Sequence, residues 1–264
     1  MAQICAETLG VPIESMRVIH GQTDRIDVGM GAFASRVTVM TGSAVKVASE
    51  ALRDKVLESA AALLTVTLSE LTYVDGHIRT AAGATLALEE FARHWAASGR
   101  TSLMAEGSFR TDQMNYPYGI HAAVARVDPE TCGVAIERLI VAVDLGRIIN
   151  PMLVEGQIAG GAAQGIGGAL FEEFVYDTNG QPLATTFADY LLPTLNEMPD
   201  VETILCEDAP SPQNPLGVKG AGEGGITGVG AAIAAAIDDA IGRPGAITRL
   251  PVTPVRLHRI LSSG

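Results

Sequence analysis

The chain has 264 residues, of which 47% are hydrophobic and 18% are charged. This balance excludes an intrinsically disordered chain and predicts a globular protein, in one large domain or two small ones. The formal net charge of −12 argues against a nucleic acid or an anionic membrane as partner. The longest apolar run, residues 229–237, is too short to cross a bilayer and ends in two aspartates, so we expect no membrane span.

The cysteines and histidines indicate neither a disulfide framework nor a metal site. Cys5, Cys132 and Cys206 lie far apart, are odd in number, and form no CxxC pair and no iron–sulfur spacing. The five histidines show no metal-ligand spacing, so we assign no side chain to a metal. The first residues also lack the basic region of a signal peptide. We therefore expect a cytoplasmic protein in a reducing compartment.

The first nine residues predict a short helix, with Gly10 as its C-cap. This helix has no side chain suited to an N-cap, and so short a helix is marginal alone. We therefore expect it to be the end of something longer. Three alternatives stay open: a partner covers it, the chain is a fragment, or the chain is the downstream half of a split protein.

The next elements are predicted from hydrophobic spacing and turn signals. Before residue 118 we expect a strand at 17–20, a glycine-bearing loop at 21–34, a helix at 39–64, a hairpin turning at Asp75-Gly76, a helix at 86–95 and a loop at 97–117. Beyond it we expect paired strands at 121–127 and 134–143, a helix from Pro151 to about residue 173, a hairpin of 174–176 with 183–187, a strand at 201–206 and a helix from about 226 to 241.

Helices and hairpins alternate without regular βαβ units, so the predicted fold class is α+β. We expect two α+β subdomains, residues 1–112 with a Gly/Ser loop and residues 113–264 with a Gly-rich helix. That helix, from Pro151, contains glycines that weaken it by about 1 kcal/mol each relative to alanine. A helix retains so many glycines only if something packs very close to it. They are Gly156, Gly160, Gly161, Gly165, Gly167 and Gly168.

One carboxylate, Glu223, stands among glycines just before the last predicted helix. Glycine lets a ligand approach the main chain, and the start of a helix favours negative charge, so Glu223 suits a general base. A tightly packed buried turn is the plainer alternative. A nucleotide-binding G-x-G-x-x-G loop is a third, but Pro212 and Pro215 stand where its strand should lie.

Residues 217–224, GVKGAGEG, resemble the active-site glutamate loop of the molybdenum hydroxylases, the family of xanthine dehydrogenase, aldehyde oxidoreductase and aerobic carbon monoxide dehydrogenase. Further segments resemble this family in order along nearly the whole chain: 22–24, 29–36, 118–124, 127–131, 143–151, 155–165, 172–176 and 189–193. The chain departs from the family pattern at Gln22, usually Asp, at Phe33-Ala34, usually Tyr-Gly, and at Val37, usually a small hydroxyl residue.

The resemblance implies a molybdenum-containing molybdopterin cofactor, in the cytosine dinucleotide form common in bacteria. It implies that Ala34, Ser35 and Arg36 cradle the pterin and phosphates, and that Gln157 and Gln164 contact the cofactor from the Gly-rich helix. It places Asp144, Gly146 and Asn150 near the nucleotide. It implies that Lys219, Gly220, Ala221 and Gly222 pass beneath the metal and that Glu223 is the catalytic base. Each binding residue has a structural alternative: Asn150-Pro151 is equally a helix start, Gln164 a surface residue and Asp144 a turn former.

The resemblance also implies an activity and its partners. Such an enzyme hydroxylates an aldehyde carbon or a carbon beside a ring nitrogen, with oxygen from water, and passes electrons to partner subunits carrying 2Fe-2S clusters and FAD. The family's upstream half would come from another chain, so this chain alone should be inactive. Two alternatives are a non-catalytic relic that serves as an assembly module and a dinucleotide-binding domain.

Overall fold

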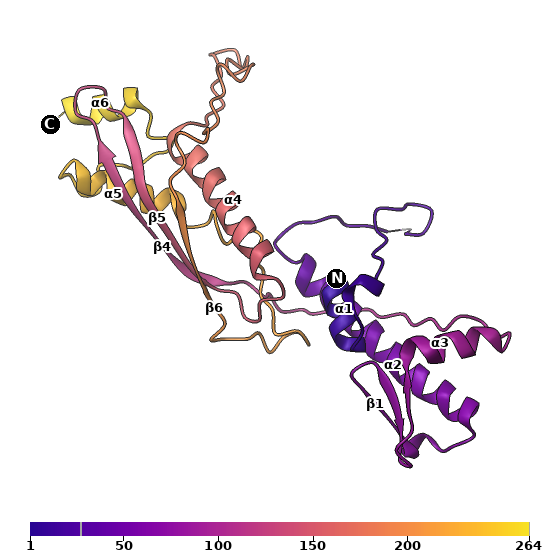
Figure 1. Ribbon diagram of the computed structural model, residues 1–264. Coiled ribbons are helices and arrows are strands. Elements are labelled where there is room, and N and C mark those ends of the chain that lie inside the picture. Colours follow the sequence, from indigo (N-terminus) through magenta and orange to yellow (C-terminus); the bar gives the residue numbers. More distant parts are fainter. Residues whose placement is uncertain (27, 264) are drawn as a thin grey trace. The chain divides into compact units, whose positions relative to one another are not determined.

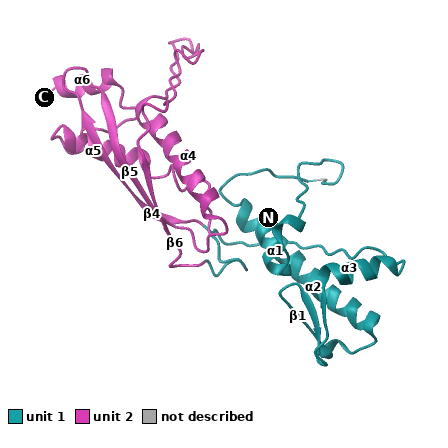
Figure 2. Cartoon of the chain, in the orientation of Figure 1, with its two compact units in different colours: residues 1–115, 211–218 teal, residues 116–210, 219–264 magenta. Residues whose placement is uncertain are grey.

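A computed structural model describes residues 1–26 and 28–263. The chain folds into two compact units, shown in Figure 2: unit 1 contains residues 1–115 and 211–218, and unit 2 contains residues 116–210 and 219–264. Each unit combines helices with a three-stranded sheet, so the predicted α+β class is confirmed. The predicted subdomain boundary at residue 112 stays a prediction.

Unit 1 places two helices against a small antiparallel sheet. Its helices and strands are α1 (Ala2–Leu9), η1 (Ile13–Ser15), η2 (Thr38–Gly42), α2 (Ser43–Leu64), η3 (Leu68–Glu70), β1 (Leu71–Val74), β2 (His77–Thr80), β3 (Thr85–Ala87) and α3 (Leu88–Ala97). The sheet order is β1-β2-β3, and the turn predicted at Asp75-Gly76 joins the first two strands. Phe91 of α3, Ile78 of β2 and Val56 of α2 are buried together in one core.

Helix α1 confirms the helix predicted for the first residues, with Gly10 as its left-handed C-cap at φ +62°. Its side chains Ile4 and Leu9 are buried, and the helix packs on α2. The hydroxyl of Tyr73 donates to the Leu9 carbonyl at 2.7 Å. Tertiary contacts within unit 1 therefore supply the stability that this short helix lacks alone.

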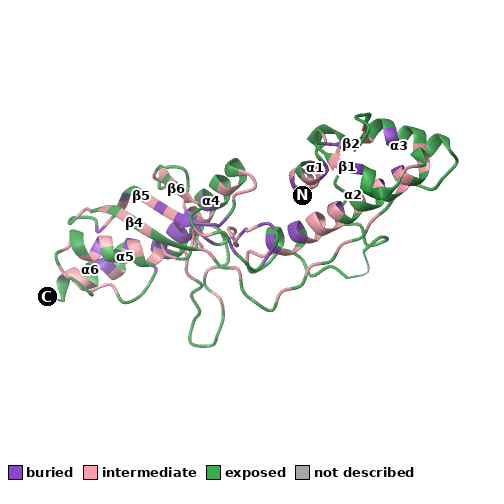
Figure 3. Cartoon of the chain, turned by 90° about the horizontal axis from the view of Figure 1, so that it is seen from below, coloured by how far each residue is buried: buried purple, intermediate pink, exposed green. Residues whose placement is uncertain are grey.

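Unit 2 is a three-stranded sheet with helices on one face (Figure 1). Its elements are β4 (Tyr118–Val127), β5 (Val134–Asp144), α4 (Pro151–Leu170), β6 (Val201–Cys206), α5 (Val229–Ala240) and α6 (Pro254–Ser262). Strand β5 pairs antiparallel with β4 and parallel with β6. Leu139 and Val141 of β5, Ile158 and Ile166 of α4, and Ile233 of α5 are fully buried in its core. Figure 3 shows buried residues gathered where α4 lies on the sheet.

One sequence prediction about local structure is wrong, one is fulfilled only in part, and one helix is missed. Residues 17–20 form no strand: Val18 and Ile19 are half exposed, and within residues 1–26 and 28–263 no strand pairs with them. The hairpin predicted at 174–187 is present around its Asn179-Gly180 turn, where an antiparallel bridge joins Tyr176 and Pro182. The Leu183 amide donates to the Val175 carbonyl and the Asp177 amide to the Gln181 carbonyl, but the pairing is too short to form regular strands. Helix α6 was not expected at all, because its only strong signal is the Thr253 N-cap followed by Pro254.

The start of the last predicted helix also needs correction. Helix α5 begins at Val229, and residues 222–228 form consecutive turns ahead of it. Glycines at 224, 225 and 228 favour turns over helix and pack closely on neighbouring elements, so they delay the helix. Glu223 therefore lies more than a turn before the helix, where the helix dipole contributes little to its charge.

Candidate functional site

In the glutamate loop, defined as residues 219–228, the backbone around the acid is buried and the Glu223 side chain is exposed. The amide of Gly224 donates to the Ala221 carbonyl at 3.1 Å, and the amide of Ile226 donates to the Glu223 carbonyl at 3.2 Å. Gly224 and Gly225 are buried, whereas Glu223 is exposed. The loop therefore presents an acid at the surface of unit 2 from a backbone fixed within it.

Helix α4 packs against this loop through its glycines. A Cβ on Gly225 would overlap the Ile158 carbonyl oxygen, and a Cβ on Gly161 would come within 3.0 Å of the Gly225 Cα. One turn further, a Cβ on Gly165 would meet the Val229 side chain at 2.6 Å. The prediction that something packs very close to the Gly-rich helix is thus confirmed at Gly161 and Gly165.

Three other glycines of α4 lie on a different, uncovered face. A Cβ on Gly156, Gly160 or Gly168 would meet no atom within 4 Å. The predicted cofactor residues Gln157 and Gln164 are two turns apart along the same exposed side of α4. This exposed stripe of α4 therefore offers two amide side chains, separated by bare helix backbone that a flat ligand could approach.

Asp144 and Lys219 form a buried ion pair at the end of β5. The Lys219 ammonium donates to the Asp144 carboxylate at 2.8 Å, and the two side chains are 10% and 3% exposed. The amides of Gly146 and Ala209 also donate to Asp144, at 2.9 and 3.0 Å. Burial alone would raise the pKa of Asp144, but these hydrogen bonds and the lysine charge hold it below its ordinary value.

This ion pair fixes the beginning of the glutamate loop. Lys219 also lies over the ring of Tyr118, with its ammonium 4.5 Å from the centroid, and its amide donates to the Leu145 carbonyl at 2.8 Å. The Asp144 carboxylate is occupied by three donors of its own unit, so we interpret it as a residue that positions Lys219 and Gly146.

Asn150 acts as the N-cap of α4. Its side-chain oxygen accepts from the Leu153 amide at 3.1 Å, and Pro151 occupies the first helical position. The helix-start interpretation of Asn150-Pro151 is therefore confirmed. Gly146 stands in the turn ahead of it at φ +61°, a conformation that favours glycine.

In unit 1, the predicted phosphate loop carries an unusual backbone turn. Ala34 and Ser35 both have positive φ, 52° and 54°, and the Arg36 amide closes the turn on the Phe33 carbonyl at 3.3 Å. Such conformations cost about 1–3 kcal/mol each for residues other than glycine and cluster at ligand clamps. At Ala34 this conformation explains why the family pattern usually has glycine there.

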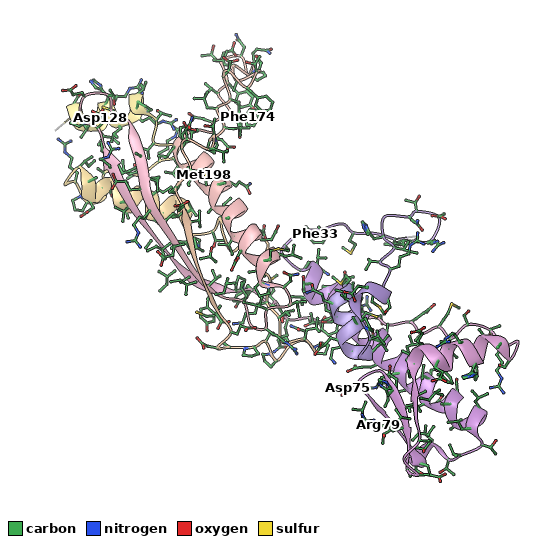
Figure 4. The ribbon with its side chains drawn as sticks, in the orientation of Figure 1. Phe33, Asp75, Arg79, Asp128, Phe174 and Met198 are labelled. Atoms are coloured by element: carbon green, nitrogen blue, oxygen red, sulfur yellow. The ribbon has the colours of Figure 1, made fainter. Side chains whose placement is uncertain are left out.

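The same loop leads into an irregular helix start. The Arg36 guanidinium lies 5.2 Å from the centre of the Phe33 ring, which Figure 4 labels at this turn. A π-helical turn, Thr38–Gly42, follows and continues into α2. Such turns occur often at functional sites. The Ser43 hydroxyl is buried and has no hydrogen-bond partner among the residues that the structure describes.

Two residues that sequence reasoning missed hold the chain around the glutamate loop. Asn214 of unit 1 donates to Asn115 and to the Val218 carbonyl, each at 2.8 Å, and it accepts from the amides of Leu216 and Val218. It thereby fixes the turn just before Lys219. The Asn-Pro step at 214–215 was the available signal. The other missed residue, His121 of β4, contacts the glutamate loop within unit 2.

Within residues 1–26 and 28–263, no group of three His, Cys, Asp or Glu side chains lies close enough to hold a metal ion. No helix of that same part is long and apolar enough to cross a membrane. Cys5, Cys132 and Cys206 are free thiols.

The family description "Molybdopterin cofactor-binding domain" matches residues 1–199. The chain is 41% identical to the 6-hydroxypseudooxynicotine dehydrogenase complex subunit gamma of Paenarthrobacter nicotinovorans, over 97% of this chain and 33% of that protein. Its fold matches a Cu,Mo-CO dehydrogenase at a TM-score of 0.89 and 30% identity, over 99% of this chain and 34% of that one. It also matches quinoline 2-oxidoreductase from Pseudomonas putida 86 at 0.86 and 34%, over 99% and 34%.

The chain belongs to the molybdopterin cofactor-binding domain family, and the resemblance to molybdenum hydroxylase large subunits is confirmed. It spans about a third of the length of the curated relatives that it matches. Glu223 and the predicted cofactor residues stay predictions about this chain.

Proposed function

We propose that this chain is the molybdopterin-binding catalytic part of a molybdenum hydroxylase, an oxidoreductase, and that Glu223 is its general base. The observation that carries the proposal is an exposed carboxylate on a loop whose backbone is buried against α4. A general base must be correctly oriented as well as ionised, and a fixed backbone orients the carboxylate. The family membership of the chain supports the same assignment.

The exposed stripe of α4 and the turn at Ala34-Ser35 fit the molybdenum cofactor. Gln157 and Gln164 offer paired donors and acceptors to the edges of a pterin or cytosine, and the uncovered Gly160 between them leaves room for its rings. Ser35 and Arg36 suit phosphate oxygens. When bound, the cofactor supplies the two-electron oxidation. We propose the cytosine dinucleotide form on the ground of the family resemblance.

In the proposed reaction, Glu223 accepts a proton from the water-derived hydroxyl that attacks the substrate. Lys219, held by Asp144 and Tyr118, keeps the loop ahead of Glu223 in place. The substrate class is an electron-poor carbon, either of an aldehyde or beside a ring nitrogen. Two of the matched proteins are named for 6-hydroxypseudooxynicotine and quinoline, which favours the N-heteroaromatic class.

The proposed enzyme is completed by other chains. Another chain would carry the upstream half of the large subunit, and partner subunits would carry the 2Fe-2S clusters and FAD. The sheet of unit 2 supports this, because the face opposite α4 and α5 exposes large apolar side chains. They are Tyr118, Ile120, Val124 and Ile204. An apolar sheet face of this kind marks an interaction surface. We place the assembly in the cytoplasm, consistent with its free thiols.

The substitution Glu223→Gln tests the proposal in the complete enzyme. Because glutamine keeps the shape and removes the base, we expect kcat to fall roughly 10²–10⁴-fold with molybdenum content unchanged. Glu130→Gln, at an exposed turn far along the chain from the loop, is the matched control and should leave kcat unchanged. Wild-type turnover in the Glu223→Gln enzyme would remove this carboxylate from the mechanism.

A further inference from the structure

A hairpin arm, defined as residues 172–197, projects from the end of α4 and away from the sheet of unit 2 (Figure 1). Eight large apolar side chains of this arm are exposed, and the most exposed are Phe174, Phe187 and Leu195, at 61%, 79% and 92%. Single exposed apolar residues are common on any protein surface. So many of them on one short segment mark the arm as an interaction site.

The base of the arm is fixed to the body of unit 2. Glu173 accepts from Arg256 at 2.5 Å and from Arg249 at 3.2 Å. The Tyr190 hydroxyl donates to Glu172 at 2.6 Å, and the Tyr190 ring lies 4.9 Å from the ring of Phe174, which Figure 4 labels. The direction of the arm is therefore set before a partner binds, which lowers the entropic cost of association.

The charge of the arm restricts what it can bind. Residues 172–197 include no lysine and no arginine, and their five acids are Glu172, Glu173, Asp177, Asp189 and Glu197. A complementary surface must combine apolar side chains with positive charge, because like charges across an interface repel.

The C-terminal part of unit 2 offers such a surface. Residues 243–259 include four arginines and His258 but no acid. On α6, Val255, His258 and Arg259 are all exposed. They follow helical spacing, so they share one face of α6, called the α6 stripe below. The α6 stripe thus combines an apolar side chain with basic ones.

We propose that the arm docks on the α6 stripe of a second copy of this chain, and that the arm of the second copy docks in return on the first. Within one copy, Leu195 is 92% and Val255 is 61% exposed, so the arm leaves its own α6 stripe uncovered. The pairs of Glu173 with Arg249 and Arg256 show that acids of the arm and arginines of residues 243–259 are compatible. The reciprocal contact closes a two-fold dimer. It does not rest on the proposed catalytic role.

Two variants remove one side of the contact each. The arm variant carries Phe187→Ser and Leu195→Ser, and the stripe variant carries Val255→Ser and Arg259→Glu. All four side chains are exposed, so we expect melting temperatures close to that of the wild type. The matched control carries Met104→Ser and Met114→Ser, which are 75% and 83% exposed in unit 1.

The experiment expresses two differently tagged copies of the chain in the native cell, purifies through one tag and measures recovery of the other. Wild-type and control copies should recover each other, whereas arm variant with arm variant, and stripe variant with stripe variant, should lose recovery by about 10-fold or more. The arm variant with the stripe variant retains one intact contact of the two, so its recovery should lie between these levels.

Three results would overturn the proposal. They are wild-type copies that do not recover each other, an arm variant that recovers itself like the wild type, and a mixed pair that recovers no better than either variant alone. If the arm variant instead loses a different subunit while its tagged copies stay together, the arm binds that subunit and the second copy is excluded as its occupant.

Discussion

Two glycine-bearing loops of this chain look alike in sequence and differ in what holds them. In the glutamate loop, Gly225 and Gly228 are required because a side chain would collide with Ile158 or His121. In the loop at residues 21–34, a Cβ on Gly21, Gly29 or Gly31 would meet nothing within 4 Å. The first loop is therefore shaped by packing inside its own unit.

The second loop is shaped by backbone conformation in open space. Gly21 and Gly31 have positive φ, and so do Ala34 and Ser35, which take this conformation at a cost. Under the proposed function, the glutamate loop is formed by folding, whereas the loop in unit 1 is a conformation prepared for a ligand.

The largest effect is expected where the glutamate loop is anchored. Lys219→Met removes one partner of a buried ion pair and leaves the Asp144 carboxylate uncompensated, so the free energy of unfolding should fall by about 3–5 kcal/mol. Chemical denaturation measures this loss. Arg138→Met breaks an exposed pair with Glu202 and should cost under about 1 kcal/mol. Equal losses in the two variants would contradict the anchoring role.

Substitution of glycine by alanine should change stability differently in the two loops. Gly225→Ala forces a methyl group into the Ile158 backbone and should cost about 1–3 kcal/mol of unfolding free energy. Gly29→Ala, which has open space and no positive φ, should change stability by less than about 0.5 kcal/mol. Thermal unfolding of both variants makes the comparison. Similar melting temperatures would mean that packing does not distinguish the loops.

In the loop of unit 1, a substitution to glycine should raise the free energy of unfolding. Ser35→Gly relieves a left-handed conformation, offset in part by the greater flexibility of unfolded glycine, so stability should rise by about 0.5–1 kcal/mol. The neighbouring Arg36→Gly, which has no positive φ, should not be stabilising. Denaturant midpoints decide the matter, and a loss of stability in Ser35→Gly would show that this turn carries no strain.

The smallest predicted effect is a pH dependence of stability from His121. Burial, opposed by the hydrogen bond to Gly224, lowers its pKa in the folded state below the usual 6.5. Between about pH 6.5 and the lower pKa of the folded state, the unfolded chain binds a proton at His121 that the folded chain does not. The free energy of unfolding therefore falls as the pH falls through this range. His121→Gln should remove this part of the pH dependence. Identical profiles between pH 5 and 7 would be the contrary result.

Local signals in the sequence predicted local structure well. Gly10, Asp75-Gly76 and Asn150-Pro151 each set a cap or turn through their own backbone preferences, and the structure has each of them in place. The prediction of a strand at residues 17–20 was wrong because a β-branched sequence forms a strand only where a partner strand is present.

Long-range arrangements could not be predicted from one sequence. The parallel pairing of β6 with β5 and the Asp144–Lys219 ion pair each join segments more than fifty residues apart. The packing of the His121 ring beside Gly228 is of the same kind. The resemblance identified Glu223 by its neighbours in sequence, but the residues that hold its loop are neighbours only in the fold.

The most direct test of the central claim is the molybdenum and nucleotide content of this chain, purified from its native cell with whatever co-purifies. The account predicts stoichiometric molybdenum, CMP released by acid, and co-purification with the proposed 2Fe-2S and FAD subunits. A chain with neither molybdenum nor a partner would contradict the proposal that it is part of a working hydroxylase.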